Sequence, residues 1–194
     1  MAIRKIKSYE DNFDFPCFAE DSLQMYIKAN ELLANNKREE LLNYVTEFAF
    51  PIMTFQTERK TIKWNFIKSN EMPLVVRVRT QSLFEKENVY AQITVRFNTR
   101  QILAVYDRFG YLIHGSDAIV KDVLEYVVFE KCLSDYNSIW RLHAKINPDW
   151  LPKKDSIYNT FVRGVAPEPP SEEELKFQKE GIISSELNQE KSTK

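Results

Sequence analysis

The stretch VYAQITVRFNTR at residues 89–100 alternates between apolar and polar side chains along most of its length. One set of positions is apolar: Val89, Ala91, Ile93, Val95 and Phe97. The other set carries polar groups: Tyr90, Gln92, Thr94, Arg96, Asn98 and Arg100. Successive side chains of a β-strand point to opposite faces, so this pattern predicts a strand with one buried face and one polar face.

The same period of two continues on both sides of this stretch. It predicts about six strands with short turns between them. The stretches are TIKWNFIKS (61–69), PLVVRVRTQSLF (73–84), VYAQITVRFNTR (89–100), QILAVYDRFGYLIHG (101–115), VLEYVVFEKCL (123–133) and IWRLHAKI (139–146). Short connections favour antiparallel pairing.

Before residue 61 the apolar residues have helical spacing. Residues 21–35 form one predicted helix, and Asn36 with Glu39 has the form of a capping box that begins a second. Pro51 predicts the end of this second helix. Helices followed by strands predict an α+β fold, in which an N-terminal helix pair packs on a curved antiparallel sheet, cone-like as in nuclear transport factor.

The chain divides by composition into three parts. Residues 1–19 lack clear periodicity and are predicted to be an N-terminal arm that packs through Phe13, Phe15 and Phe18. Residues 20–152 are predicted to form a single α+β domain. Residues 153–194 are predicted to be an extended, mostly disordered acidic tail, because their later part is polar, acidic and rich in proline at its start.

Composition argues against several classes of protein. The four glycines form no phosphate-binding cluster, and the two cysteines are too far apart in sequence to indicate a zinc site or a disulfide framework. No apolar run approaches the ~20 residues of a membrane span. The first residues have the pattern of neither a secretory signal nor a transit peptide.

Charge is distributed unevenly along the chain. Residues 59–108 hold ten basic and four acidic side chains, whereas residues 117–135 are acidic. Even spacing puts each pair of arginines in the predicted strands on one sheet face. Six residues are therefore candidates for contact with RNA or a partner: Arg77, Arg79, Arg96, Arg100, Arg141 and Lys145. The alternative is a solvated face neutralised by Glu85, Glu87 and the acidic strand.

A catalytic alternative stays open on residues alone. His143 lies between two cations on the polar side of its strand, and Asp107 with His114 is a conceivable pair across a turn. Under this hypothesis the fold encloses a small molecule in an apolar pocket between sheet and helices. The ordinary interpretation is structural for both histidines, for Cys132 and for the carboxylates of residues 122–130, and we expect no metal or cofactor site.

Two long blocks closely resemble the family of mitochondrial large-subunit ribosomal protein forty-five. They are NVYAQITVRFNTRQILAVYDRFGYLIHG (88–115) and KDVLEYVVFEKCLSDYNSIWRLHAKINPDW (121–150). The most specific motifs are ITVRFNTRQ, YDRFG and DVLEYVVFEK. A looser pattern, a VFEK-type strand, a turn and then WRLH, is also similar to the membrane-anchor subunit of the mitochondrial inner-membrane import motor.

The resemblance implies a non-enzymatic structural role in the mitochondrial matrix. Family members sit near the nascent-chain exit of the large ribosomal subunit, contact rRNA and neighbouring proteins, and help dock the ribosome at the inner membrane near the insertase. It implies no catalytic residue, cofactor or small-molecule substrate. Members usually carry a targeting segment and a basic extension before the region that RKIKSYEDNFD resembles, and this sequence begins almost at that region.

Overall fold

The computed structural model describes residues 2–55, 57–82 and 87–150, which belong to one compact unit, Met1–Leu151. Four helices come first: α1 (Ala2–Tyr9), α2 (Phe15–Ala34), α3 (Arg38–Leu41) and α4 (Ala49–Thr54). Five strands follow: β1 (Lys60–Ser69), β2 (Leu74–Ser82), β3 (Val89–Asp107), β4 (Leu112–Cys132) and β5 (Arg141–Ile146). This order confirms the predicted α+β class. The tail predicted at 153–194 lies outside the described residues.

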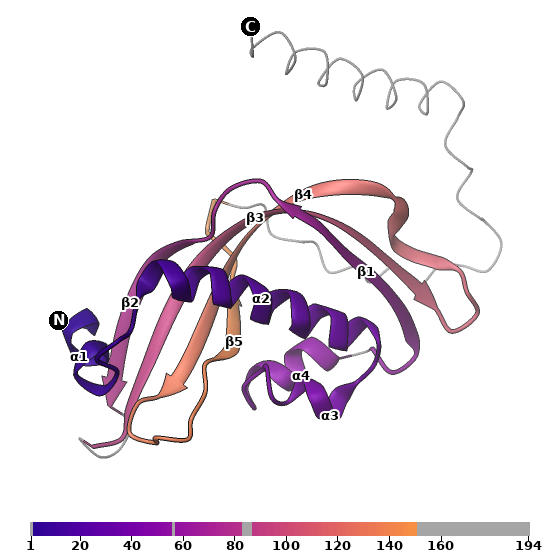
Figure 1. Ribbon diagram of the computed structural model, residues 1–194. Helices are drawn as coiled ribbons and strands as arrows, with labels where there is room; N and C mark the ends of the chain where they lie inside the picture. Colours follow the sequence, from indigo (N-terminus) through magenta and orange to yellow (C-terminus); the bar gives the residue numbers. More distant parts are fainter. Residues whose placement is uncertain (1, 56, 83–86, 151–194) are drawn as a thin grey trace, which may run out of the picture. The chain divides into compact units, whose positions relative to one another are not determined.

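Strand β3 is the centre of a single antiparallel sheet. Its first half pairs with β2 and its second half with β1, while β4 runs along its other edge and β5 pairs with β4. The sheet curves over the helices, as predicted (Figure 1). The described residues form five strands rather than about six, because the stretch predicted at 101–115 is divided: residues 101–107 continue β3, and residues 112–115 begin β4. The sequence around the boundary between Arg100 and Gln101 contains no glycine or proline that would form a turn. The strand therefore continues through this boundary.

The helical part differs from the prediction at both ends. The predicted arm holds α1, and α2 begins at Phe15 rather than at residue 21, so the boundary predicted at 19/20 falls inside a helix. The carboxylate of Asp14 caps α2 by accepting a hydrogen bond from the main-chain N–H of Cys17, 3.3 Å away. The predicted packing of the arm aromatics is confirmed, since the ring centroids of Phe13 and Trp140 are 5.7 Å apart.

The second predicted helix is interrupted between α3 and α4. The main chain of residues 44–46 pairs with β5: Leu142 N–H donates to Tyr44 O at 2.8 Å, and Thr46 N–H donates to Leu142 O at 2.9 Å. These sheet-like hydrogen bonds replace the helical ones, so tertiary pairing overrides the local helical pattern. None of the described helices has both the length and the apolar character needed to cross a membrane.

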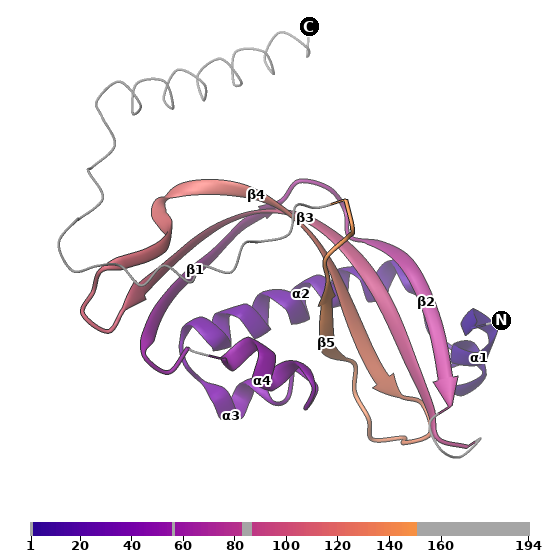
Figure 2. The same ribbon diagram turned by 180° about the vertical axis from the view of Figure 1, so that it is seen from behind.

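The core lies between the helices and one face of the sheet, and the view from behind shows the same layering (Figure 2). The inward side chains of β3 are the predicted ones, each at most 1% exposed: Val89, Ala91, Ile93, Val95 and Phe97. Tyr26 of α2 packs against Phe97 with ring centroids 5.2 Å apart, and Phe129 of β4 meets Phe97 edge-on at 6.3 Å. Burying each such side chain contributes about 2 kcal/mol.

A polar network is buried beneath the sheet, centred on Tyr26. Its hydroxyl donates to Glu125 Oε2 at 2.6 Å and accepts from Gln101 Nε2 at 3.2 Å. The indole N–H of Trp64 donates to Gln101 Oε1, and Lys145 Nζ lies 3.0 Å from Glu125 Oε1. Burial, reinforced by the charge of Glu125, raises the pKa of Tyr26 far above its usual value.

We expect Tyr26→Phe to lower the free energy of unfolding by about 1–3 kcal/mol at neutral pH, because Glu125 and Gln101 each lose a buried partner. The folded-state pKa of Tyr26 is raised, so its contribution is complete below the unfolded pKa of about 10 and declines as pH rises above it. The decline reaches ~1.4 kcal/mol per pH unit.

Urea unfolding of both proteins between pH 8 and pH 11 measures this effect. The difference between wild type and Tyr26→Phe should shrink above pH 10, since the variant lacks the titrating hydroxyl. A difference that stays constant over the whole range would show that Tyr26 is not held neutral by the fold.

Gly115 gives a second stability test with an internal control. Its φ is +75°, and an added Cβ would lie 2.0 Å from the main-chain oxygen of Leu103. Gly110 also has positive φ, +84°, but nothing lies within 4 Å of an added Cβ. We expect Gly110→Ala to cost about 1–2 kcal/mol from backbone strain alone. Gly115→Ala should cost roughly 1–3 kcal/mol more, because β3 must move. Equal melting temperatures for the two variants would contradict this register.

Candidate functional site

The sheet face turned away from the helices, here called the convex face, carries the predicted polar side chains of β3. Strand β2 contributes to the same face through a bulge at Val76, the residue skipped where Val75 pairs with Val95 and Arg77 with Thr94. Val75 and Val78 both pack against the core. The strict alternation predicted for β2 is therefore wrong around Val76.

The strand register brings four of the candidate arginines onto the convex face. Arg77 lies opposite Thr94 and Arg79 opposite Gln92, next to the positions of Arg96 and Arg100 on β3. Because side chains two apart on a strand share a face, all four project from the same side of the sheet. The four arginines thus share a face but are spread along β3, from the position of Gln92 to Arg100, and their role as contacts stays a prediction.

Most of these cations have partners within the chain. Arg96 pairs with Glu71 in the β1–β2 turn, and Arg100 Nε lies 2.8 Å from Asp122 Oδ1 on β4. Hydrogen bonds from Arg100 and Asn70 lower the pKa of the Asp122 carboxyl. The acidic strand therefore neutralises at least Arg100, through Asp122, as the alternative interpretation predicted. Glu85, the other expected source of negative charge, lies outside the described residues.

Arg79 and Arg77 differ from these paired arginines. Arg79 Nε donates to Gln92 Oε1 at 2.6 Å, and Gln92 in turn donates to Glu130. Arg77 makes no hydrogen bond or ion pair with any residue in the described ranges. Its guanidinium therefore offers a full set of donors to an external anion.

Of the two candidates on β5, Arg141 lies opposite Glu130 and therefore on the convex face, whereas Lys145 lies opposite the buried Val127 on the helix side. A bulge at His143 interrupts the pairing of β5 with β4, so the expected alternation of Arg141, His143 and Lys145 on one side is wrong. Arg141 forms a bidentate pair with Glu47, with nitrogen–oxygen distances of 2.8 and 3.4 Å. Lys145 Nζ lies 5.3 Å from the centre of the Tyr26 ring, on the helix side.

The convex face also holds apolar side chains that the sequence pattern did not assign to it. Leu74 lies opposite Arg96, which lies opposite Tyr126, which lies opposite Ile146. Leu74 and Ile146 at the two ends of this row are both exposed. The surface is therefore mixed, with cations for anionic groups and apolar residues for packing. The bulge at Val76 turns Leu74 outward, and no sequence signal marks that bulge.

The residues of the catalytic alternative make structural contacts. His143 Nδ1 lies 3.1 Å from Thr46 Oγ1 and 3.5 Å from Glu130 Oε1, and its ring stacks on Phe48. The Asp107 carboxylate accepts the main-chain N–H of Arg108, while His114 lies opposite Val105 on β3.

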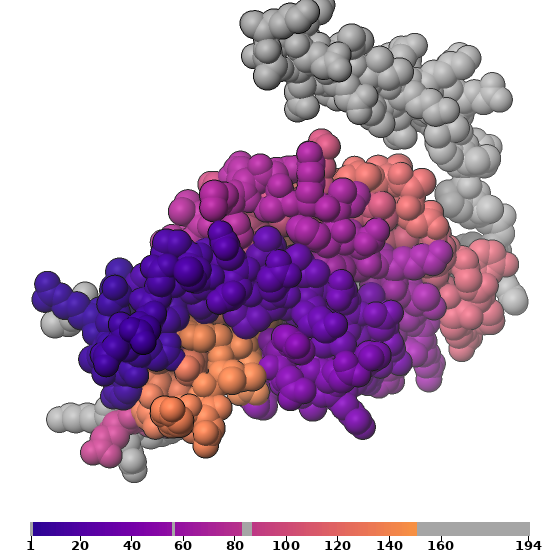
Figure 3. Space-filling view, viewed as in Figure 1, coloured from indigo at the N-terminus to yellow at the C-terminus, as the bar shows by residue number. Residues whose placement is uncertain are grey.

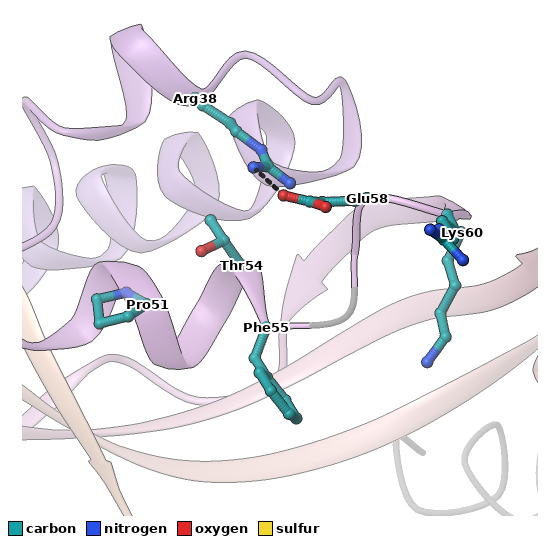
Figure 4. Close-up of a pocket in the computed structure, with 7 residues that line it drawn as sticks. Arg38, Pro51, Thr54, Phe55, Glu58 and Lys60 are labelled. Atoms are coloured by element: carbon teal, nitrogen blue, oxygen red, sulfur yellow. Dashed lines mark hydrogen bonds and ion pairs between the residues drawn. The ribbon is translucent and has the colours of Figure 1, made fainter.

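Buried side chains from the helices and from the inner face of the sheet pack into one cluster in the region where the predicted enclosed site would lie. One hollow of about 610 Å³ lies at the surface between α3, α4 and β1 (Figure 4). A second, of about 830 Å³, is lined by four carboxylates and the rings of Phe13, Tyr136 and Trp140.

The model of the Tim44-like domain family matches residues 1–147, which contain the whole helix layer and the five strands of the sheet described above. The chain belongs to the Tim44-like domain family.

Three relatives place the chain more narrowly within this class, and each is named "Large ribosomal subunit protein mL45". The relative from Drosophila melanogaster is 47% identical over 173 residues, which are 89% of this chain and 48% of the relative. The relative from Bos taurus is 43% identical over 93% of this chain and 59% of its own length. The relative from Caenorhabditis elegans is 40% identical over 81% and 44%.

The chain spans about half the length of the curated relatives it matches. Their shared name confirms the predicted resemblance to large-subunit ribosomal protein forty-five. It is the name of a ribosomal protein rather than an enzyme, in agreement with the predicted non-enzymatic class.

Removing one internal counter-ion should strengthen anion binding by the convex face. In Glu71→Gln the partner of Arg96 loses its charge, so we expect later elution from heparin–agarose in a salt gradient. Glu31→Gln is the matched control, because it makes the same charge change on α2, where Glu31 pairs with Lys28. Identical elution shifts for both variants would show that net charge, and not the convex face, controls retention.

Proposed function

We propose that the chain is a non-enzymatic structural constituent of the mitochondrial large ribosomal subunit and acts in mitochondrial translation. The observation that carries the proposal is the identity of 40–47% with relatives named as large-subunit proteins from insect, mammal and nematode. The continuous hydrophobic core agrees with it, because a scaffold needs a rigid core beneath its binding surface.

The site within the ribosome follows from the family resemblance. We propose a position near the nascent-chain exit, where the domain contacts rRNA and neighbouring proteins and helps dock the ribosome at the inner membrane beside the insertase. The Tim44-like domain agrees with a role at that membrane. The protein then acts in the mitochondrial matrix.

The convex face is the part of the domain best suited to rRNA. Arginine matches phosphate oxygens with two parallel hydrogen bonds, and Arg77 has no competing partner in the described parts of the chain. Arg79 is held only by the neutral amide of Gln92. The exposed Leu74 and Ile146 on the same face are suited to a protein neighbour.

The test is sedimentation of tagged protein in sucrose gradients of mitochondrial lysate. We expect the wild type to migrate with the large subunit and to move to the top after RNA digestion. Arg77→Glu should reduce the fraction that co-sediments several-fold, and Arg77→Glu with Arg96→Glu should reduce it further, because phosphate contacts become repulsive. Lys28→Glu, an equal charge change on α2, should sediment as wild type.

The outcomes separate the parts of the proposal. Wild type that stays at the top of the gradient would refute the ribosomal role. Charge-reversed variants that co-sediment normally would refute the assignment of the RNA contact to the convex face. Circular dichroism of each variant checks that the fold is retained.

A further inference from the structure

The outer side of helix α4 is entirely apolar. Its side chains follow the helical spacing i, i+3, i+4 and i+7 and are exposed: Phe48, Pro51, Ile52 and Phe55. Phe48, Ile52 and Phe55 are 58%, 63% and 74% exposed. Ala49 and Met53, which lie on the other side, pack against the core. We call the four exposed residues the α4 stripe.

This arrangement is the reverse of the usual surface helix. A helix packed on a core normally shows polar residues to solvent, and contiguous exposed apolar groups mark interaction sites. The inner side of α4 already contributes to the folded core through Ala49. In the outer stripe Phe48 stacks on His143, but Ile52 and Phe55 remain 63% and 74% exposed, so their apolar character needs a different explanation.

A basic hollow adjoins the α4 stripe (Figure 4). Pro51, Thr54 and Phe55 form one part of its wall, and the other part consists of the charged residues Arg38, Glu58, Arg59 and Lys60. Arg38 and Glu58 neutralise each other at 3.1 Å. Arg59 is exposed and makes no ion pair or hydrogen bond with any described residue. The hollow therefore combines apolar walls with a net positive charge.

We propose that the α4 stripe and this hollow form a docking site for an amphipathic segment of a partner protein, with apolar side chains on one face and carboxylates beside them. The apolar side chains pack on Ile52 and Phe55, and a carboxylate pairs with Arg59. Charge complementarity selects the acidic partner, as at other protein interfaces. In the space-filling view, the part of this chain that contains α3 and α4 lies at the surface (Figure 3).

Two other occupants fit the site less well. A second copy of the chain, related by a two-fold axis, would place two hollows of the same net positive charge in one interface, which adds repulsion. RNA would satisfy Arg59 but leave the aliphatic part of the stripe against a sugar–phosphate backbone. The site lies on the helix side of the sheet, so it is separate from the convex face and does not depend on the proposed RNA contact.

The test uses the purified chain and two fluorescently labelled helical peptides of about twelve residues. Both carry leucines at i, i+4 and i+7, flanked by glutamates in one peptide and by lysines in the other. We expect the glutamate peptide to bind at least tenfold more tightly in fluorescence anisotropy, with affinity that falls as salt rises. Ile52→Ser should abolish binding, and Arg59→Glu should weaken it about tenfold.

The matched controls are Met72→Ser, which removes another exposed apolar side chain, and Lys28→Glu, which reverses another exposed charge. Both should bind the glutamate peptide as wild type does. Failure of the glutamate peptide to bind, or equal binding of both peptides, would overturn the proposal. So would tighter binding of a uridine dodecamer or of anionic phospholipid vesicles that depends on Arg59, or self-association that Ile52→Ser abolishes.

Discussion

The register of β3 determines the positions of nearly all other parts of the domain. This strand pairs with β2 through its first half, with β1 through its second half and with β4 along its whole length. A slip of one residue would exchange the buried and polar faces of β3 and would turn Phe97 outward. The five apolar residues up to Phe97 fix the register, because each is nearly fully buried. The core and the convex face are thus two consequences of one alternation.

The Tyr26 network holds the half-buried carboxylate of Glu125 at the edge of the core. Glu125 accepts from Tyr26 and is neutralised by Lys145, so its negative charge is compensated on both sides. A buried carboxylate without such partners would titrate or admit water. The network joins α2, β3, β4 and β5 through Tyr26, Gln101, Glu125 and Lys145, so it ties the helix layer to three strands of the sheet.

The sequence predicted the features that depend on regular alternation and missed those that depend on tertiary pairing. The α+β class, the curved antiparallel sheet and the inward residues of β3 follow from period-two patterning, since one buried face imposes it. The bulges at Val76 and His143 do not, because an extra residue leaves no compositional mark and is fixed by neighbouring strands. Consequently Arg77 was assigned to the correct face, whereas Lys145 was not. The break between α3 and α4 was missed for a similar reason, as it depends on pairing with Leu142.

The internal ion pairs decide how strongly each arginine of the convex face can contribute to binding. For Arg96 or Arg100 to bind a phosphate, it must share or give up the carboxylate of Glu71 or Asp122, so the net gain is small. Arg77 has no such carboxylate among the described residues, so on binding a phosphate its guanidinium exchanges only bound water. The four arginines of β2 and β3 therefore behave, in their dependence on salt, like one or two phosphate contacts rather than four. Selective electrostatics of this kind would concentrate the proposed RNA contact on Arg77 and Arg79, because these arginines need not release a carboxylate of the described chain before they bind a phosphate.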